Sequence, residues 1–329
     1  MCRGYLGIDV GSISTNIVLV GEQRDMLFSS YVRVNGNPID SVKGCMKALS
    51  KLLADNDMEI GGLCTTGSGR ELIGAMMGAD MVKNEISAHA RAAVELHPDV
   101  RTIIEIGGQD SKVTIIEDGA VVDFEMNLVC AAGTGSFLDS QARRLGISIE
   151  ELSRRSLRSR HPTAIAGRCT VFAESDMISK QQMGYAQEDI LMGLCHALAR
   201  NLIGNVARGK PLHAPVLLQG GVSANLGIVR AFEDILGCGI IVPEHHMVMG
   251  AYGAALLALD ANVPESRFRG TGIQERHIYT QCIVCEDCPN NCETVAIIDS
   301  GAVVGRTGGR CGKLSHSTFA GKNIAMSPG

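Results

Sequence analysis

The feature that most constrains the fold is a short pattern that occurs twice. Ile8-Asp9-Val10-Gly11 ends one apolar, β-branched run, and Ile104-Glu105-Ile106-Gly107 ends another 96 residues later. Each copy joins an acid to a glycine turn and opens a predicted set of three strands. A repeat of this kind predicts an internal duplication, with two similar domains facing each other across a cleft.

Alternation of apolar and polar positions predicts strands, and apolar positions three or four residues apart predict helices. The predicted strands are residues 5–10, 16–20 and 26–34 in the first copy, and 101–106, 112–117 and 120–125 in the second. The main predicted helices are residues 39–55, 131–145, 173–183 and 187–208. We therefore expect an α/β fold with domains at residues 1–98 and 99–260, followed by a linker and a cysteine-rich tail at 261–329.

Composition and charge exclude several classes of protein. A net charge of −5 without a basic stripe argues against a nucleic-acid partner. No run of 18 apolar residues is present, so no membrane span is expected. The first residues lack the apolar core and cleavage site of a signal peptide, which predicts a cytoplasmic protein. In that compartment the 12 cysteines indicate metal or redox chemistry rather than disulfides.

The turn after the first strand has the composition of a phosphate-binding loop. Small residues allow backbone amides to approach phosphate oxygens, and hydroxyl groups add hydrogen bonds. The candidate contacts in this turn are Gly11, Ser12, Ser14 and Thr15. Asp9 is a short acid at the strand end, suited to hold hydrated Mg²⁺ or to orient water. Hairpin tips are also often rich in glycine and serine for steric reasons alone.

Three further turns make the nucleotide interpretation stronger than the steric one. Gln109 and Asp110 lie in the matching turn of the second copy, and Gly220-Gly221-Val222 follows a third buried strand. Gly133-Thr134-Gly135 adds a set of amides at the start of a predicted helix. Four such turns in this order predict a phosphate-binding site.

Two cysteines have small-residue surroundings that set them apart from the others. Cys130 opens Cys-Ala-Ala-Gly-Thr-Gly-Ser-Phe at a predicted helix start, and Cys169 lies just before another helix. A cubane iron–sulfur cluster takes four thiolates, and one chain offers two here. A symmetric dimer would supply all four. The alternative is that both residues are buried core thiols.

These motifs resemble a known superfamily. The order of an Asp-x-Gly-Ser-x-Ser-Thr turn, a Glu-Ile-Gly-Gly-Gln-Asp-Ser-Lys segment and a Gly-Gly-Val-x-x-Asn turn resembles the actin, sugar-kinase and heat-shock-chaperone ATPases. Within them, residues 127–138 around Cys130 and 167–180 around Cys169 resemble the activators of 2-hydroxyacyl-CoA dehydratases, a branch shared with subunits of ATP-dependent benzoyl-CoA reductase. The resemblance covers about Tyr5 to Leu259. It implies a duplicated actin-like, ribonuclease H-like α/β fold with nucleotide in the interdomain cleft.

The resemblance also implies a mechanism. It implies a homodimer with one [4Fe-4S] cluster at its axis, held by Cys130 and Cys169, and an ATPase that uses Mg²⁺. A ferredoxin or flavodoxin would donate the electron, and an iron–sulfur acyl-CoA dehydratase or related reductase would receive it. Asp9, Glu105 and Gln109 would serve Mg²⁺ and the attacking water. Glu105 stands where many members of the superfamily carry aspartate.

The tail departs from the simpler activators. Its cysteines follow the spacing of a bacterial ferredoxin run, with a fifth in Gly-Gly-Arg-Cys-Gly. These residues are Cys282, Cys285, Cys288, Cys292 and Cys311. A second iron–sulfur cluster is the favoured interpretation, and a tetrahedral zinc site is the alternative. The competing functions for the whole chain are a small-molecule kinase, such as one for an amino sugar, and a regulatory ATPase with a zinc-binding tail.

Overall fold

A computed structural model describes residues 2–127 and 130–311 of the chain. Residues 128–129 of the first cysteine motif and 312–329 of the predicted tail lie outside the described residues. By the density of its contacts the chain divides into two compact units: unit 1 is residues 1–85 with 250–329, and unit 2 is residues 86–249. The boundaries of these units differ from those of the predicted domains at residues 1–98, 99–260 and 261–329. The domain division stays a prediction.

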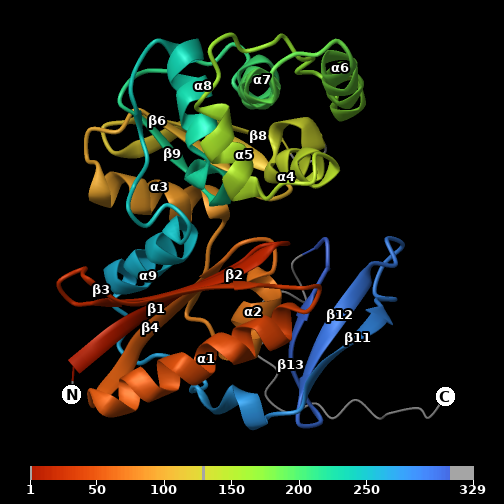
Figure 1. The fold of residues 1–329 in the computed structure, drawn as a ribbon. Coiled ribbons are helices and arrows are strands. Elements are labelled where there is room, and N and C mark those ends of the chain that lie inside the picture. Colours follow the sequence, from red (N-terminus) through yellow and green to blue (C-terminus); the bar gives the residue numbers. More distant parts are fainter. Residues whose placement is uncertain (1, 128–129, 312–329) are drawn as a thin grey trace. The chain divides into compact units, whose positions relative to one another are not determined.

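Among the described residues, unit 1 is built on a five-stranded sheet in the order β3-β2-β1-β4-β5 (Figure 1). The strands are β1 (Cys2–Val10), β2 (Ser14–Gly21), β3 (Met26–Arg33), β4 (Met58–Thr66) and β5 (Met81–Val82). The central strand β1 is antiparallel to β2 and parallel to β4. The hairpin of β1 and β2 therefore places the turn after Asp9 at the carboxyl end of the central strand.

Helices cover both faces of this sheet (Figure 1). The apolar side chains of α1 (Pro38–Asp55) share one buried core with Leu6 and Ile8 of β1 and with α2 (Arg70–Met77). The opposite face meets α9 (Met249–Ala261), where a Cβ on Gly7 would lie 1.9 Å from the Ala251 carbonyl oxygen. Only a glycine permits this approach, so Gly7 fixes α9 closely against β1.

In the part of the chain that is described, unit 2 repeats this sheet, in the order β10-β9-β6-β7-β8. The strands are β6 (Thr102–Ile106), β7 (Ser111–Glu117), β8 (Ala120–Asn127), β9 (Val216–Gln219) and β10 (Ile240–Ile241). Strand β6 is antiparallel to β7 and parallel to β9, as β1 is to β2 and β4. The predicted α/β duplication is therefore confirmed.

The two faces of the second sheet differ in character. Ile104 and Ile106 of β6 belong to a large apolar core that includes residues of α4, α5, α7 and α8. Glu105 points to the other face, where His89 of α3 contacts it. The helices of this unit are α3 (Glu85–Leu96), α4 (Gly135–Arg144), α5 (Ile149–Ser156), α6 (Thr170–Gln182), α7 (Gln187–Asn201) and α8 (Leu226–Leu236).

Three predicted helix boundaries were wrong. The helix expected over residues 131–145 begins as a single 3₁₀ turn, Ala131–Gly133, and its α-helix starts at Gly135. The helix expected from residue 173 starts at Thr170, directly after Cys169. The helix expected over 187–208 is α-helical to Asn201 and then widens to a π-helix, Leu202–Val206. Within residues 2–127 and 130–311, no helix combines the length and apolarity that a membrane crossing requires.

The described part of the tail forms a three-stranded antiparallel sheet that the sequence analysis did not predict. Its strands are β11 (Ile278–Val284), β12 (Glu293–Asp299) and β13 (Ala302–Thr307). Ile278 and Ile297 join the core of unit 1, and a Cβ on Gly305 would lie 2.4 Å from Ala75 Cβ of α2. The preceding segment is fixed as well, because Arg267 N donates to Asp80 Oδ1 at 2.7 Å. This sheet therefore packs as part of unit 1.

Candidate functional site

The turn after β1 lies against a second turn after β4. Asp9 pairs with Thr66 in the sheet, and Gly69 N donates to the Val10 carbonyl at 2.8 Å. Gly67 has φ +88°, and a Cβ there would lie 2.5 Å from Asp9 Oδ1. The second turn, residues 66–69, was missed as part of the site. The sequence feature that could have revealed this turn is the Thr-Gly-Ser-Gly run directly after a buried strand.

The side chains of the first turn point in different directions. Gly11 N donates to the Ser14 carbonyl at 2.9 Å and closes the turn. Ser12 is exposed and Ser14 is half-buried. Thr15 is fully buried, and its Oγ1 lies 2.6 Å from Ser41 Oγ of α1. The Thr15 hydroxyl is therefore turned toward helix α1, and a phosphate contact of this side chain stays a prediction.

Gly67→Ala should strongly reduce ATP hydrolysis. An alanine at positive φ costs about 1–3 kcal/mol, and its methyl group would displace Asp9. A displacement of about 1 Å at a reacting centre lowers rates by on the order of 10²-fold. Steady-state hydrolysis measures this. Gly36→Ala is the matched control, because Gly36 has φ +81° and open space around its Cβ position. Equal rates in the two variants would contradict the placement of Gly67 beside the reacting groups.

In unit 2, the turn after β6 is bonded to the segment that follows Cys130. Gly135 N donates to the Gly107 carbonyl and Ser136 N donates to the Gly108 carbonyl, both at 2.9 Å. These are the first two residues of α4, so the start of this helix is attached to the turn. The Thr134 hydroxyl is buried and donates to the Ala131 carbonyl at 2.9 Å.

The turn after β9 completes this group. A Cβ on Gly220, which has φ +88°, would lie 2.5 Å from the Ile106 carbonyl oxygen. A Cβ on Gly135 would lie 3.0 Å from Val222 Cγ2. Three predicted segments, around residues 107–110, 133–135 and 220–222, are thus brought together within unit 2. Gly221 and Gln109 are exposed there, and Asp110 is half-buried.

A buried ionic network lies on the α3 face of the sheet. Lys112 is 1% exposed, and its Nζ lies 3.0 Å from Glu105 Oε1 and 2.9 Å from Asp110 Oδ2. His89 Nε2 lies 3.4 Å from Glu105 Oε1, and Gln219 Nε2 lies 3.0 Å from His89 Nδ1. A buried lysine needs such partners, because an unpaired buried charge is costly. Lys112 therefore ties the predicted residues Glu105 and Asp110 together. His89 and Gln219 were missed, since no local pattern marks them.

His246 supports the turn at Gly220. The Gly220 amide donates to the His246 carbonyl at 2.9 Å, and Ser223 Oγ lies 2.8 Å from His246 Nδ1. Burial lowers the pKa of His246, and its hydrogen bond with Gly220 opposes this shift in part. The folded protein therefore favours the neutral imidazole.

The His246 shift predicts a loss of stability in acid. A folded-state pKa below the unfolded value of about 6.5 means that the unfolded chain binds the proton more readily. The stabilisation is present above pH 6.5 and is lost as the pH falls through the folded pKa. Urea unfolding at pH 7.5 and pH 5.5 should show a smaller acid-induced decrease for His246→Gln than for the wild type. His161→Gln, at an exposed position, is the control and should match the wild type.

Cys130 and Cys169 share one local geometry. Cys130 is the N-cap of the 3₁₀ turn, and Cys169 is the N-cap of α6. Both are partly exposed. Asn127 holds the Cys130 backbone from both sides, since its Oδ1 accepts from Cys130 N at 2.9 Å and its Nδ2 donates to Cys130 O at 2.7 Å. Backbone amides close to such thiols are the groups that hydrogen-bond to the sulfurs of a bound iron–sulfur cluster.

Other cysteines have a different environment. Cys45 and Cys195 are buried, and Cys238 is half-buried against the core of unit 2. Burial raises the pKa of Cys195 to about 12, and that of Cys64 likewise to about 12. These thiols stay protonated at neutral pH. Cys130 and Cys169 differ from these thiols in lying at helix starts, and their role as ligands stays a prediction.

Cys285, Cys288 and Cys292 lie in the loop that joins β11 to β12. Cys285 N donates to the Cys292 carbonyl at 2.9 Å, and Asn291 N donates to the Cys288 carbonyl at 3.2 Å. Cys282 and Cys311 are exposed. Across the described ranges 2–127 and 130–311, no three His, Cys, Asp or Glu side chains are placed together as metal ligands. A metal site of the tail stays a prediction.

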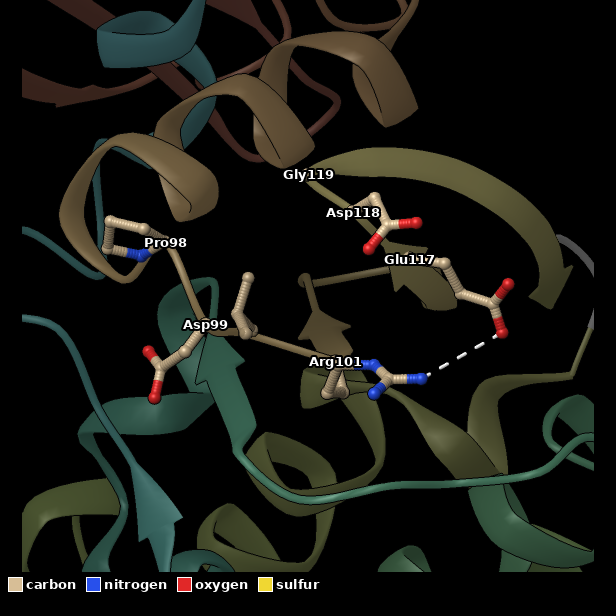
Figure 2. A pocket seen from close by; sticks show the side chains of 7 residues that line it. Pro98, Asp99, Arg101, Glu117, Asp118 and Gly119 are labelled. Atoms are coloured by element: carbon tan, nitrogen blue, oxygen red, sulfur yellow. Dashed lines mark ion pairs between the residues drawn. The ribbon is translucent and has the colours of Figure 1, made fainter.

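Unit 2 also has a surface hollow (Figure 2). It is lined by Pro98, Asp99, Val100, Arg101, Glu117, Asp118 and Gly119. Arg101 and Glu117 form an ion pair there at 3.8 Å. These residues flank the start of β6 and the end of β7, whereas the turn at residues 107–110 joins the opposite ends of the same strands. The hollow is therefore separate from the candidate nucleotide turns.

Known proteins share both the sequence motifs and the fold. The sequence model of the BadF/BadG/BcrA/BcrD ATPase family matches residues 6–258. The (R)-2-hydroxyglutaryl-CoA dehydratase activating ATPase of Acidaminococcus fermentans is 36% identical over 256 residues, which is 77% of this chain and 96% of that protein. The activator of lactoyl-CoA dehydratase from Anaerotignum propionicum is 36% identical over 260 residues, or 78% of this chain and 97% of the relative.

A solved structure agrees with these relatives. The activator of the 2-hydroxyisocaproyl-CoA dehydratase from Clostridium difficile with bound ADPNP superposes with a TM-score of 0.69 at 35% identity. The match covers 79% of this chain and 95% of that chain. The predicted actin-like ATPase fold is confirmed.

Proposed function

Because the chain belongs to the BadF/BadG/BcrA/BcrD ATPase family, we propose that it is an ATP-dependent activator of an iron–sulfur enzyme. ATP hydrolysis would drive one electron at low potential from a [4Fe-4S] cluster, shared across a homodimer, to a 2-hydroxyacyl-CoA dehydratase or a related reductase. A ferredoxin or flavodoxin would reload the cluster. The relatives named above are activators of such dehydratases.

One observation carries this proposal. The segment that begins at Cys130 is attached by two main-chain hydrogen bonds to the turn that contains Gln109 and Asp110. A change at the nucleotide turn therefore acts on the thiol segment through a bonded connection. A kinase with the same fold would have no use for partly exposed thiols at two helix starts.

The residues of the two units take separate roles. In unit 1, Asp9 would hold hydrated Mg²⁺ or orient the attacking water, and the amides of residues 11–15 would bind phosphate. In unit 2, Gln109 would orient water and Glu105 would be held in place by Lys112. Gly220 and Gly221 would allow the nucleotide to approach the backbone. When bound, Mg²⁺ neutralises charge that develops on the phosphate oxygens.

The exposed residues after Cys169 support a dimer. Val171 is 67% exposed and Phe172 is 65% exposed at the start of α6. Large apolar side chains at such exposure are typical of a surface that a partner covers. A second copy that covers them would bring its own pair of thiols near the first, which makes the four ligands that a cubane cluster takes. In its reduced form, the cluster supplies the transferred electron.

The tail is proposed to bind metal separately. Cys285 and Cys292 are joined by a main-chain hydrogen bond at the hairpin end, and Cys288 lies in the loop between them. Together with Cys282 they keep ferredoxin-like spacing, so we favour a second iron–sulfur cluster over zinc. Such a cluster would offer a route by which an electron donor reaches the protein.

The test is activation of an inactive 2-hydroxyacyl-CoA dehydratase under oxygen-free conditions. We expect dehydration of the acyl-CoA only when the protein, MgATP and a strong reductant are all present. Iron and labile sulfide analysis of the same preparation should show a reducible cluster. Transfer of phosphate from ATP to a sugar, unchanged by removal of iron, would support a kinase instead. Zinc as the sole metal, without a reducible centre, would support a regulatory ATPase.

A further inference from the structure

Unit 2 contains a small polar cluster between the nucleotide turn and both cysteine segments. It surrounds Gly133, whose added Cβ would lie 2.8 Å from Asn201 Oδ1, 3.3 Å from Asn127 Nδ2 and 3.5 Å from Ser111 Oγ. Ser111 is fully buried and Asn201 is 3% exposed. Buried polar side chains gathered at one glycine have to be explained, because burying them costs free energy.

Each member of the cluster reaches a different functional segment. Ser111 directly follows Asp110 of the nucleotide turn and pairs with Asn127 across β7 and β8. Asn127 holds the backbone of Cys130. Asn201 Nδ2 donates to the carbonyl of Gly167, two residues before Cys169. The cluster therefore touches the nucleotide turn, the Cys130 segment and the Cys169 segment.

The position of Asn201 makes it the connection between the two thiol segments. It is the last residue of α7, where the helix widens into the π-helix at Leu202–Val206. Local π-helical geometry is frequent at functional sites. The neighbouring Gly167 has no room for a side chain, since a Cβ there would lie 2.9 Å from the Ala197 carbonyl oxygen of α7. The Cys169 segment is thus closely fitted to the end of α7.

Two hydrogen-bonding atoms of the cluster leave scope for a second arrangement. In the part of the chain that the structure describes, Asn201 Oδ1 and Ser111 Oγ are buried without a hydrogen-bond partner. A small shift that let Ser111 donate to Asn201 would satisfy both. In such a shift, a movement of the nucleotide turn would move the end of α7. Coupling between two sites requires an element of this kind, with two discrete arrangements.

We propose that Asn201 is a positioning residue that transmits the nucleotide state from the turn at residues 107–111 to the segment of Cys169. Cys130 receives the same signal by a different route, through the main-chain bonds from Gly107 and Gly108 to the start of α4. The proposal deepens the proposed function, because it states how both thiols of one chain respond together.

The test uses the full-length, iron-free protein, so it does not depend on the cluster. Alkylation of Cys130 and Cys169 by iodoacetamide is followed residue by residue by mass spectrometry, with either MgADP or Mg-ADPNP bound. In the wild type we expect both rates to differ between the nucleotides, by roughly fivefold or more. Asn201→Leu keeps a similar volume and cannot donate to Gly167. In this variant the response of Cys169 should fall below about twofold, while that of Cys130 persists.

Asn205→Leu is the matched control, because Asn205 is exposed in the π-helix that follows α7. It should behave like the wild type. Asn201→Ala serves if the leucine variant does not fold, and equal ADPNP affinity in all variants confirms intact binding. A wild-type response of Cys169 in Asn201→Leu would overturn the proposal, as would equal loss at both cysteines or no response in the wild type. Dehydratase activation by the iron-loaded wild type tests the proposed function independently.

Discussion

Asp9→Asn should lower ATP hydrolysis by about 10²- to 10⁴-fold, the range expected when a positioned acidic group is lost. Asp9 lies at the end of β1, is 8% exposed and contacts the Gly67 position. The amide keeps the shape of the carboxylate but removes the charge that would hold Mg²⁺ or orient water. The protein should therefore fold normally and lose turnover.

Phosphate release under saturating MgATP measures this effect, and thermal unfolding checks the fold. Asp57→Asn is the matched control, since Asp57 is exposed in the same unit and has φ +48°, a conformation that asparagine tolerates. It should hydrolyse ATP at the wild-type rate. Hydrolysis by Asp9→Asn within about threefold of wild type, well outside the expected range, would remove Asp9 from the reacting groups.

Cys130→Ser and Cys169→Ser should each abolish the shared cluster. Each chain of the proposed dimer contributes both residues, so one substitution removes two of the four thiolates. Iron and labile sulfide should fall by one cluster per dimer, and dehydratase activation should be lost. ATP hydrolysis should persist, because the hydrogen bonds from this segment to the turn at Gly107 come from the backbone of Gly135 and Ser136 and not from the thiols.

The control for the cysteine variants is Cys238→Ser. Cys238 is half-buried in the same unit, packs at the edge of the core and has no predicted ligand role. Its iron content should equal that of the wild type. Electron paramagnetic resonance of the reduced proteins separates loss of the shared cluster from any signal of the tail. Full iron content and an unchanged spectrum in both ligand variants would exclude these cysteines as ligands.

Features carried by short stretches of sequence were predicted well. The repeated acid and glycine turn indicated the duplicated sheets, because strand ends and tight turns are set by neighbouring residues. Helix starts were predicted less well. The backbone at residues 131–134 makes a 3₁₀ turn before α4 because Gly135 is fixed by the turn at Gly107, a contact that local sequence does not reveal.

Features that depend on distant residues were missed. His89 and Gln219 reach Glu105 from separate elements, and only folding brings them together. The turn at residues 66–69 became part of the site because β4 lies parallel to β1, which is a property of the sheet order. The strands of the tail were not predicted from the sequence. The cysteine spacing was conspicuous, whereas the apolar pattern at Ile297 and Ile298 is short.

The sheet of the tail changes what it means to shorten this protein. Ile278 and Ile297 fill a core that also contains Ile73 and Met76 of α2, and Gly305 sits directly on Ala75. Cutting the chain after α9 would leave that side of α2 bare and favour aggregation. Unit 1 and the sheet of the tail are therefore expected to fold together. Damage to one of them, including oxidation of the hairpin thiols in air, would destabilise the other.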